Sequence, residues 1–234
     1  MNILKGMQII DLGLYLAKEK TLIIADTHIG FEESLNKQGL LVPRLQFDEL
    51  IKRLKCILEK VKPETIIING DIKHEFGTIS EQEWKYTLKL LDFLIGQCKK
   101  VILIKGNHDT ILGPIANKRD IEIKEHCLIN KVLIIHGNKV FSEKKDYDTI
   151  IIGHEHPAVC IKEGARKERY KCFLKGKFKN KNLIAMPSFN LVTEGTDVIK
   201  EKILSPYLKQ DLSNFDVFVV GDKVYRFGKL KGLG

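Results

Sequence analysis

Five short apolar runs along the chain each end in a polar cluster, and this pattern predicts buried strands with functional residues at their ends. The runs cover residues 22–25, 65–68, 101–104, 132–135 and 150–152 and are rich in isoleucine and leucine, as is typical of buried strands. The polar residues that follow them are Asp26, His28, Asp71, Asn107, His108, Asp109, His136, His154 and His156. Because open α/β sheets bind ligands at the carboxyl ends of their strands, we expect these side chains to lie close together.

Two segments between the apolar runs have apolar residues at three- and four-residue spacing, which predicts two amphipathic helices. The first helix begins near Gln46 and ends before Pro63, which cannot continue it. The second begins at Ser80 and runs to about Cys98. Ser80 and Glu83 have the spacing of a capping box, in which the hydroxyl accepts from a backbone amide and the glutamate reaches back. Residues 29–44 fit neither pattern, and we expect a loop that borders the functional site.

The second half of the chain contains mostly strand patterns, whereas the first half alternates strands with helices. Residues 1–20 suit a short β-hairpin, a strand pair is expected near 121–123 and 128–135, and residues 217–220 are expected to close a sheet. This change along the chain predicts an α/β fold in which two sheets pack face to face with helices outside. No repeat, low-complexity run or linker divides the sequence, so we expect residues 1–234 to form a single domain.

Composition restricts the class of protein. A hydrophobic fraction of 44% is ordinary for a globular chain. No apolar run approaches the roughly 20 residues of a membrane span, and the N-terminal sequence has no signal-peptide core. We therefore expect a cytoplasmic protein with no membrane partner. The five cysteines are odd in number and include no CxxC pair, which indicates reduced thiols rather than a disulfide framework.

The formal net charge is +9, and such a balance favours polyanions such as nucleic acid. A Lys- and Glu-rich surface of the kind found in heat-tolerant proteins would give a similar balance. Residues 157–182 interleave aromatic residues with the basic residues Lys162, Arg166, Lys167, Arg169, Lys171, Lys175, Lys177, Lys179 and Lys181. This segment is compatible with a phosphate-contacting surface or with a solvated hairpin whose lysines discourage edge pairing.

The polar residues behind the strands have the chemistry of metal ligands. Oxygen is available from Asp26, Asp71 and Asn107, and imidazole nitrogen from His28, His136, His154 and His156. Mixed oxygen and nitrogen ligation suits Mn²⁺, Fe²⁺, Zn²⁺ or Ni²⁺, and affinity alone does not choose between them. Seven ligands are too many for one tetrahedral ion, whereas two ions about 3.5 Å apart, bridged by Asp71, would use them all.

In chain order these residues form the elements D-x-H, G-D, G-N-H-D, an isolated His and G-H-x-H, which span positions 26 to 156. This order resembles the calcineurin-like metallophosphoesterase superfamily. The resemblance implies a four-layer α/β/β/α sandwich with two mixed β-sheets. It assigns one ion to Asp26, His28, Asp71 and His156, and the other to Asp71, Asn107, His136 and His154. It also implies attack by a metal-bridging hydroxide, with His108 as proton donor and Asp109 as its orienting partner.

The motifs also resemble one subgroup, the archaeal SbcD-related and DNA-ligase-associated phosphoesterases, around residues 25–30, 73–76, 153–157 and 186–189. In that branch a histidine at the position of His74 lies beside the metals, although His74 could equally hold a ligand through a hydrogen bond. The full repair nucleases also carry a DNA-capping domain and a segment that binds an ATPase partner. We expect no room for either in 234 residues, and hence no processive resection of double-strand ends.

These features favour a manganese-preferring phosphodiesterase or nuclease that acts on nucleic acid ends or single strands, with a role in DNA repair. The alternative is a phosphodiesterase or phosphatase for small cyclic nucleotides or nucleotide derivatives. A non-catalytic scaffold, as in the retromer subunit of this fold, is disfavoured by His108 and the complete ligand set. Arg44 is expected either to position phosphate or to cap a helix. The oligomeric state stays open, with a homo-oligomer among the options.

Overall fold

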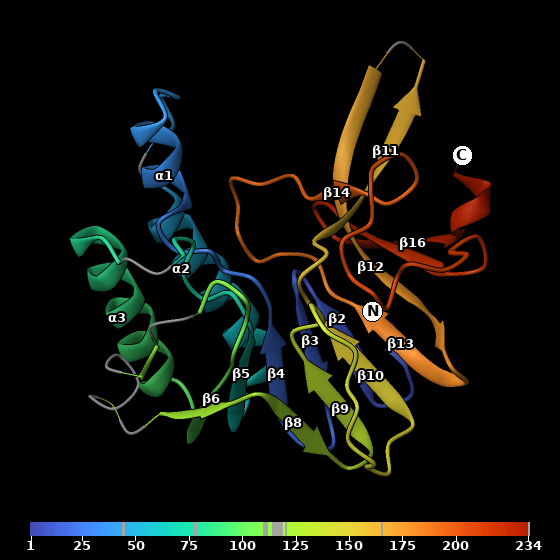
Figure 1. Ribbon diagram of the computed structural model, residues 1–234, viewed down its shortest axis with the longest axis horizontal. Coiled ribbons are helices and arrows are strands. Elements are labelled where there is room, and N and C mark those ends of the chain that lie inside the picture. Colours follow the sequence, from blue (N-terminus) through green and yellow to red (C-terminus); the bar gives the residue numbers. More distant parts are fainter. Residues whose placement is uncertain are drawn as a thin grey trace.

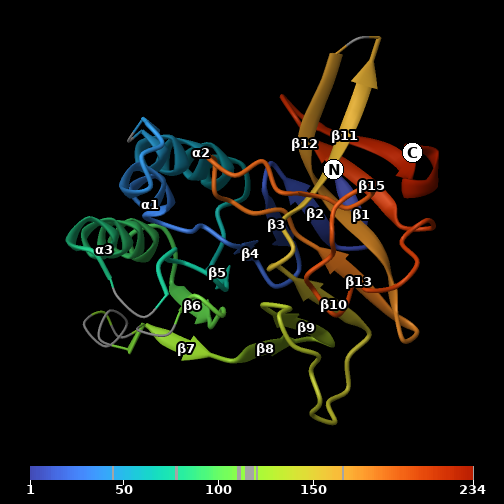
Figure 2. The same cartoon turned by 45° about the horizontal axis from the view of Figure 1, so that its top comes forward.

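Two β-sheets pack face to face, and three helices lie on the outer side of the first sheet (Figures 1 and 2). The computed structural model describes residues 1–43, 45–76, 79–109, 112–113, 119, 121–164 and 166–233. No helix in these ranges combines the length and the apolar character that crossing a membrane requires.

The first sheet is mixed, and the spatial order of its strands follows the sequence. Its strands are β1 (Asn2–Leu4), β2 (Met7–Ile10), β3 (Gly13–Leu16), β4 (Thr21–Ile24), β5 (Thr65–Asn69), β6 (Lys100–Ile104) and β7 (Glu122–Lys124). The strands from β1 to β4 pair antiparallel, and those from β4 to β7 pair parallel. The parallel pairing brings the carboxyl ends of β4, β5 and β6, where the first three motifs begin, to one edge of the sheet.

Three helices cover the outer face of this sheet: α1 (Phe31–Lys37), α2 (Gln46–Val61) and α3 (Glu81–Ile95). The helix predicted from Gln46 is α2, which buries Leu50, Leu54 and other apolar residues of the predicted face. The helix predicted from Ser80 is α3, and the Ser80 hydroxyl accepts from the Glu83 amide at 3.1 Å. Helix α1 lies within the segment predicted as a loop. It has seven residues and its N-cap is Gly30, so neither periodicity nor a polar N-cap marks it in the sequence.

The second sheet is also mixed. Along one path its strands are β14 (Thr196–Asp197), β11 (Pro157–Glu163), β12 (Arg166–Phe178), β13 (Lys181–Ala185), β10 (Thr149–Ile152), β9 (Val132–Ile135) and β8 (His126–Ile129). Strand β15 (Asp216–Val220) pairs with β12 and with β16 (Val224–Lys229). Strands β9, β10 and β13 are parallel, so their carboxyl ends also share an edge.

Side chains of the second sheet alternate between two cores. Ile134, Ile151 and Ile184 belong to the core shared with the first sheet, whereas the neighbouring Leu133 and Ile150 belong to a second core. The second core is closed by residues from 198–215 and by the short 3₁₀ helix η1 (Leu230–Gly232). The predicted α/β fold with two mixed sheets is therefore confirmed. Within the described residues, the layer outside the second sheet is irregular chain and η1, rather than an α-helix.

Candidate active site

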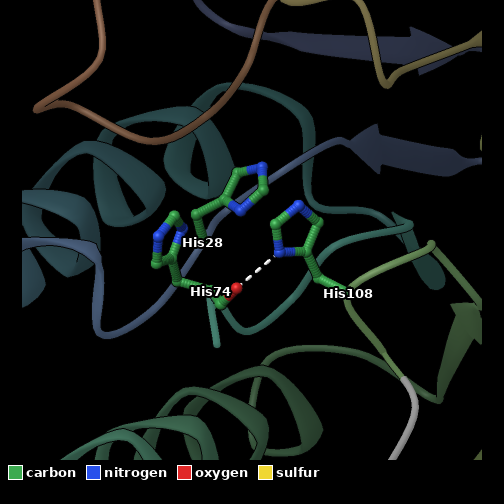
Figure 3. A group of neighbouring side chains, drawn as sticks. All are labelled: His28, His74 and His108. Atoms are coloured by element: carbon green, nitrogen blue, oxygen red, sulfur yellow. Dashed lines mark hydrogen bonds between the residues drawn. The ribbon is translucent and has the colours of Figure 1, made fainter. Parts of the chain in front are cut away.

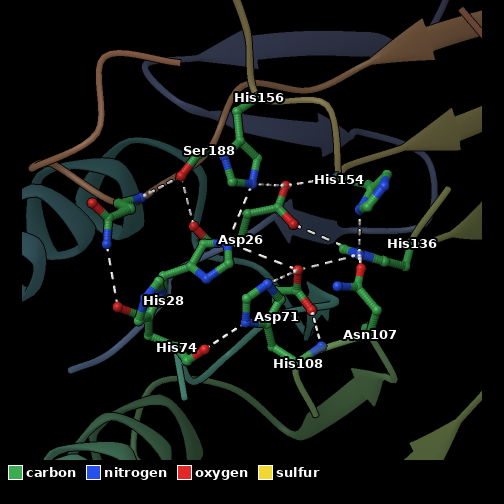
Figure 4. Close-up of polar contacts among 12 residues, drawn as sticks. Asp26, His28, Asp71, His74, Asn107, His108, His136, His154, His156 and Ser188 are labelled. Atoms are coloured by element: carbon green, nitrogen blue, oxygen red, sulfur yellow. Dashed lines mark hydrogen bonds and ion pairs between the residues drawn. The ribbon is translucent and has the colours of Figure 1, made fainter. Parts of the chain in front are cut away.

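The predicted polar residues converge where the carboxyl ends of the two sheets' parallel strands meet. The first sheet contributes the residues behind β4, β5 and β6, and the second sheet those behind β9 and β10. Figure 4 shows these side chains pointing toward one centre: Asp26, His28, Asp71, Asn107, His108, His136, His154 and His156. The convergence follows from parallel pairing in both sheets, because each parallel strand ends on the same side.

Asp26, His28 and His156 form one group, whose ligand atoms all lie within 4.8 Å of one another. The Nε2 atoms of His28 and His156 are 3.2 Å apart, and His156 Nε2 lies 3.6 Å from Asp26 Oδ2. Asp71 borders this group, with its Oδ2 atom 3.8 Å from His28 Nε2.

Asp71, His136 and His154 form a second group of the same size. His136 Nε2 lies 3.3 Å from Asp71 Oδ2 and 3.1 Å from His154 Nδ1. The amide oxygen of Asn107 lies 2.9 Å from the same His136 nitrogen. Asp71 therefore stands between the two groups, as a carboxylate shared by two ions would.

The donor atoms fit divalent cations. Two pairs of imidazole nitrogens face each other, His28 with His156 and His136 with His154, and each pair can share at most one hydrogen bond. The buried Asp26 Oδ1 has no hydrogen-bond partner among the described residues. Converging oxygen and nitrogen lone pairs in a buried site are the environment that a cation satisfies. One ion would be held by Asp26, His28, Asp71 and His156, and the other by Asp71, Asn107, His136 and His154.

Five of these residues have left-handed backbone conformations, which are unusual for residues other than glycine. Their φ angles are 53° at Asp26, 41° at His28, 46° at Asp71, 64° at His154 and 53° at His156. Each such residue costs about 1–3 kcal/mol, and such residues cluster at functional sites. Hydrogen bonds between the loops offset part of this cost, for example from the Asp26 amide to the Gly70 carbonyl at 3.1 Å.

Two glycines let the ligand loops approach one another closely. A Cβ atom on Gly70 would overlap the His136 ring, and one on Gly106 would overlap the carboxylate and the amide nitrogen of Asp71. The glycines in the G-D and G-N-H elements are thus required by packing between loops that are far apart in the sequence.

His108 lies at the side of the first group, and a backbone carbonyl orients its ring. Its Nδ1–H donates to the carbonyl of His74 (Figure 3). Because a carbonyl oxygen can only accept, this bond fixes a proton on Nδ1. The Nε2 atom lies 3.9 Å from Oδ2 of Asp71, the residue that stands between the two groups.

Asp109 does not make the contact with His108 that the resemblance implies. Its carboxylate accepts from the Ile72 amide at 3.1 Å and from the Gly106 amide at 2.9 Å. It therefore ties the loop after β5 to the loop after β6, because both loops present backbone N–H groups to it. Burial and the charge of Asp71 raise the pKa of Asp109 to about 7.

The His74 ring lies beside the first group. Its centroid is 5.5 Å from those of His28 and His108, and 4.4 Å from that of Phe31. The start of the 29–44 segment thus borders the site through Phe31. Arg44 lies outside the described residues, and its role stays a prediction.

Asp71 and His136 stabilise each other's charged form. Burial would raise the pKa of Asp71, but the hydrogen bond and charge of His136 outweigh it and hold this pKa well below its usual range. Burial would lower the pKa of His136, but Asp71 and Asp26 raise it to about 9. Since a metal ligand must be deprotonated, metal binding here should release a proton.

Sequence reasoning missed the side chains that hold the first ligand loop. Ser188 Oγ donates to the Asp26 carbonyl at 2.8 Å, and Asn190 Nδ2 donates to the carbonyls of Thr27 and His28 at 3.1 and 3.2 Å. Lys171 Nζ in turn donates to the carbonyls of Ser188 and Asn190. The available signal was the position of Ser188 and Asn190 after β13, which ends at the same edge as β10.

Glu155, between two predicted ligands, was also missed. Its Oε2 atom accepts from the amides of Leu204 and Ser205 at 2.9 and 2.6 Å. Ser205 Oγ donates to the carbonyl of Gly137 at 2.8 Å. Glu155 thereby links the loop of His154 and His156 to the loop that follows His136.

Comparisons with solved structures found similar proteins. The nuclease MPE of Pseudomonas putida superposes with a TM-score of 0.66 at 20% identity, covering 94% of this chain and 100% of that chain. A phosphoesterase of E. coli, Yfce, has a TM-score of 0.43 at 11% identity and covers 90% and 97% of the two chains. The Aquifex aeolicus protein AQ665 has a TM-score of 0.39 at 20% identity and covers 58% of this chain and 78% of that chain.

The likeness to the nuclease supports the fold, whereas the two lower scores carry no further argument. No curated protein matches the chain. The family model of the calcineurin-like phosphoesterases matches residues 19–192, which is more than half of the sequence. This range contains every residue of both groups, together with His108. The chain therefore belongs to the calcineurin-like phosphoesterase family.

Proposed function

We propose that this phosphoesterase hydrolyses phosphodiester bonds of nucleic acid, at ends or in single strands, with two divalent ions, preferably manganese. The observation that carries the proposal is that two groups of ligand atoms share Asp71 while His108 Nε2 faces the shared carboxylate. Oxygen from two aspartates and one asparagine, mixed with imidazole, suits manganese. Membership of the SbcD-related subgroup is part of the proposal and is supported by the motifs around His74 and His154.

Two divalent ions, when bound, would activate water for attack and neutralise phosphoryl charge. The chain's own residues would orient the reacting groups. Asp71 fixes the spacing of the two groups, and its Oδ1 atom accepts from the His108 amide at 2.9 Å. That bond holds the backbone of His108 while the His74 carbonyl holds its ring. His108 Nε2 is thus placed to protonate the leaving oxygen.

The lysines of the β11–β12 hairpin favour a polyanionic substrate. Strand β11 begins directly after His156, and the β11–β12 hairpin extends beyond the other strands of the second sheet (Figure 1). Lys162 lies six residues beyond His156, a distance of about 20 Å along an extended strand. It pairs across the hairpin with Lys167, and like charges directly opposite each other are destabilising unless an anion balances them.

The basic residues of 157–182 divide into two kinds. Arg169, Lys171, Lys175 and Lys181 contact other parts of the protein, for example Arg169 with Glu201 at 2.6 Å. Lys162, Arg166, Lys167, Lys177 and Lys179 are exposed. Only the exposed set is therefore offered to a substrate, and the name of the similar Pseudomonas protein, a nuclease, agrees with nucleic acid as that substrate.

The test compares a dye phosphodiester with oligonucleotides of increasing length on manganese-loaded enzyme. We expect hydrolysis of both, and a KM for oligonucleotides that rises steeply with salt. In His108→Ala we expect oligonucleotide cleavage to be lost and dye-ester cleavage to fall much less, because a stable phenolate needs little protonation to leave. Cleavage of the dye ester and of cyclic nucleotides without cleavage of any oligonucleotide would favour the small-substrate alternative.

A double variant, Lys162→Ser with Lys167→Ser, sharpens the test. At about 3.4 Å per stacked nucleotide, the hairpin pair should contact only substrates that extend roughly six nucleotides from the cleaved bond. We expect a higher KM for long oligonucleotides and no change for dinucleotides or the dye ester. The matched control replaces Lys55 and Lys60, which are exposed on α2, and should change neither. Equal kinetics for long and short substrates in the double variant would contradict a role for the hairpin.

A further inference from the structure

Glu83 is a buried carboxylate that lies beneath the loop carrying His74, although it belongs to α3. Its Oε1 atom accepts from two consecutive backbone amides, those of His74 at 2.7 Å and Glu75 at 2.9 Å. A capping-box glutamate would reach back to the amide of Ser80, but Glu83 binds this loop instead. Hydrogen bonds to a carboxylate are among the stronger ones that backbone amides make.

The amide of Glu75 and the carbonyl of His74 belong to the same peptide group. The described residues contain no cis peptide bond, and in a planar trans peptide the N–H and C=O bonds point in opposite directions. Glu83 holds the N–H on one side of this peptide, so the carbonyl is directed to the other side. There it accepts the hydrogen bond from His108 Nδ1.

The surroundings leave Glu83 little freedom to move. A Cβ atom added to Gly30 would lie only 3.1 Å from Glu83 Cγ, so the backbone of Gly30 packs directly against this side chain. The second carboxylate oxygen, Oε2, is buried and has no hydrogen-bond partner among the described residues. Within the described part of the chain, the hydrogen bonds of the carboxylate therefore involve one oxygen atom and the His74–Glu75 loop.

We propose that Glu83 is a positioning residue that orients the His108 imidazole for proton transfer through the His74–Glu75 peptide group. The proposal rests on the proposed phosphoesterase function, in which His108 protonates the leaving oxygen. Glu83 itself touches neither the ligand groups nor the reacting atoms. Its effect is confined to the direction in which a single backbone carbonyl points.

The test compares Glu83→Ala with Glu83→Gln on two phosphodiesters, one with a phenolic dye leaving group and one with an alkyl or nucleoside leaving group. A misdirected acid slows departure of a poor leaving group far more than departure of a stable phenolate. We expect Glu83→Ala to lower kcat at least tenfold for the alkyl ester and less than threefold for the dye ester, with KM unchanged. Glu83→Gln retains the oxygen that accepts both amides and should stay within threefold of the wild type.

Glu155→Ala is the matched control, because Glu155 also gives one buried oxygen to two consecutive amides. With saturating manganese it should change both esters by the same factor. The ¹⁵N resonance of His108 Nδ1 gives a readout besides activity, and it should shift in Glu83→Ala but not in Glu83→Gln.

Equal losses on both esters in Glu83→Ala, or a Glu83→Gln variant as slow as Glu83→Ala, would overturn the proposal. If Glu83→Ala does not fold, Glu83→Asp replaces it, because its shorter side chain withdraws the oxygen from both amides and keeps the buried charge. A wild-type enzyme that cleaves neither ester would refute the proposed function instead, and the His108 resonance would still test the positioning contact.

Discussion

Glu83 and Glu155 make the same kind of contact, Glu83 with a loop of the first sheet and Glu155 from a loop of the second sheet. Each is buried, each accepts two consecutive amides on one oxygen, and burial raises the pKa of each. They differ in what they hold. Glu83 holds the peptide group that orients His108, whereas Glu155 links the loops that carry the histidines of the second sheet.

The difference reflects a division of labour between the two sheets. The first sheet supplies every oxygen atom proposed as a ligand and also His108, whereas the second sheet supplies only imidazoles, from His136, His154 and His156. The same buried carboxylate contact should therefore affect chemistry on one side and metal retention on the other. Variants on each side can separate these two effects.

Asp71→Asn should have the largest effect, because Asp71 is the residue that joins the two sides. A neutral amide shared by two cations removes one of the two negative charges in the site. We expect kcat to fall by about a thousandfold or more and bound metal to fall from two ions per chain toward one, as measured by elemental analysis. Asp48→Asn, on the first turn of α2, is the control. Two retained ions with full activity would show that Asp71 does not bridge.

Glu155→Ala should weaken metal binding more than chemistry. Groups that hold ligand loops typically contribute about 10- to 100-fold in metal affinity, because the ligands lose their fixed orientation. We expect a higher manganese concentration for half-maximal activity, recovery of kcat when manganese is in excess, and a lower melting temperature. A kcat that excess manganese does not restore would mean that the two glutamates are not different in kind.

The sequence predicted the convergence of these side chains well because each follows a recognisable strand. The strand patterns and the G-D and G-N-H elements can each be read from a short stretch of sequence. Parallel pairing then brings the strand ends together. The roles of Glu83 and Asp109 could not be predicted from spacing, because each depends on which distant amide lies within reach. Glu83 has the capping-box position after Ser80, yet its carboxylate accepts hydrogen bonds from the backbone amides of His74 and Glu75. Helix α1 was missed because seven residues after a glycine carry no periodic pattern.

Phe76→Ala should have a smaller effect, limited to the side of the first sheet. The Phe76 ring lies 3.7 Å from the His108 ring, centroid to centroid, and 58% of the residue is exposed. An exposed ring beside the imidazole proposed as the proton donor offers a face on which a nucleobase can stack, which is worth about 1–3 kcal/mol. We expect KM for oligonucleotides to rise about tenfold while the dye ester is unaffected, and Phe76→Tyr to behave like the wild type. An equal change in KM for an abasic oligonucleotide would contradict stacking.

Lys171→Met should have the smallest effect on catalysis and should appear mainly as a change in the pH dependence of stability. Burial, together with the positive charge of Arg53, lowers the pKa of Lys171 to about 7, whereas an unfolded chain has a lysine pKa of about 10.4. Between these values the unfolded state binds more protons, so this residue makes the free energy of unfolding rise with pH. The rise is at most about 1.4 kcal/mol per pH unit, and the cost of burying the charge is fully present below pH 7.

Urea unfolding at pH 7, 8.5 and 9.5 measures this dependence, and the difference between wild type and Lys171→Met removes the contribution of tyrosines and cysteines that titrate in the same range. The hydrogen bonds from Lys171 to the carbonyls of Ser188 and Asn190 favour the charged form, so we expect a slope below the limit. A difference that stays constant from pH 7 to 9.5 would show that Lys171 is charged throughout. Its ammonium group would then support the Asp26 loop from the second sheet at every working pH, as Glu83 supports the His108 loop from α3.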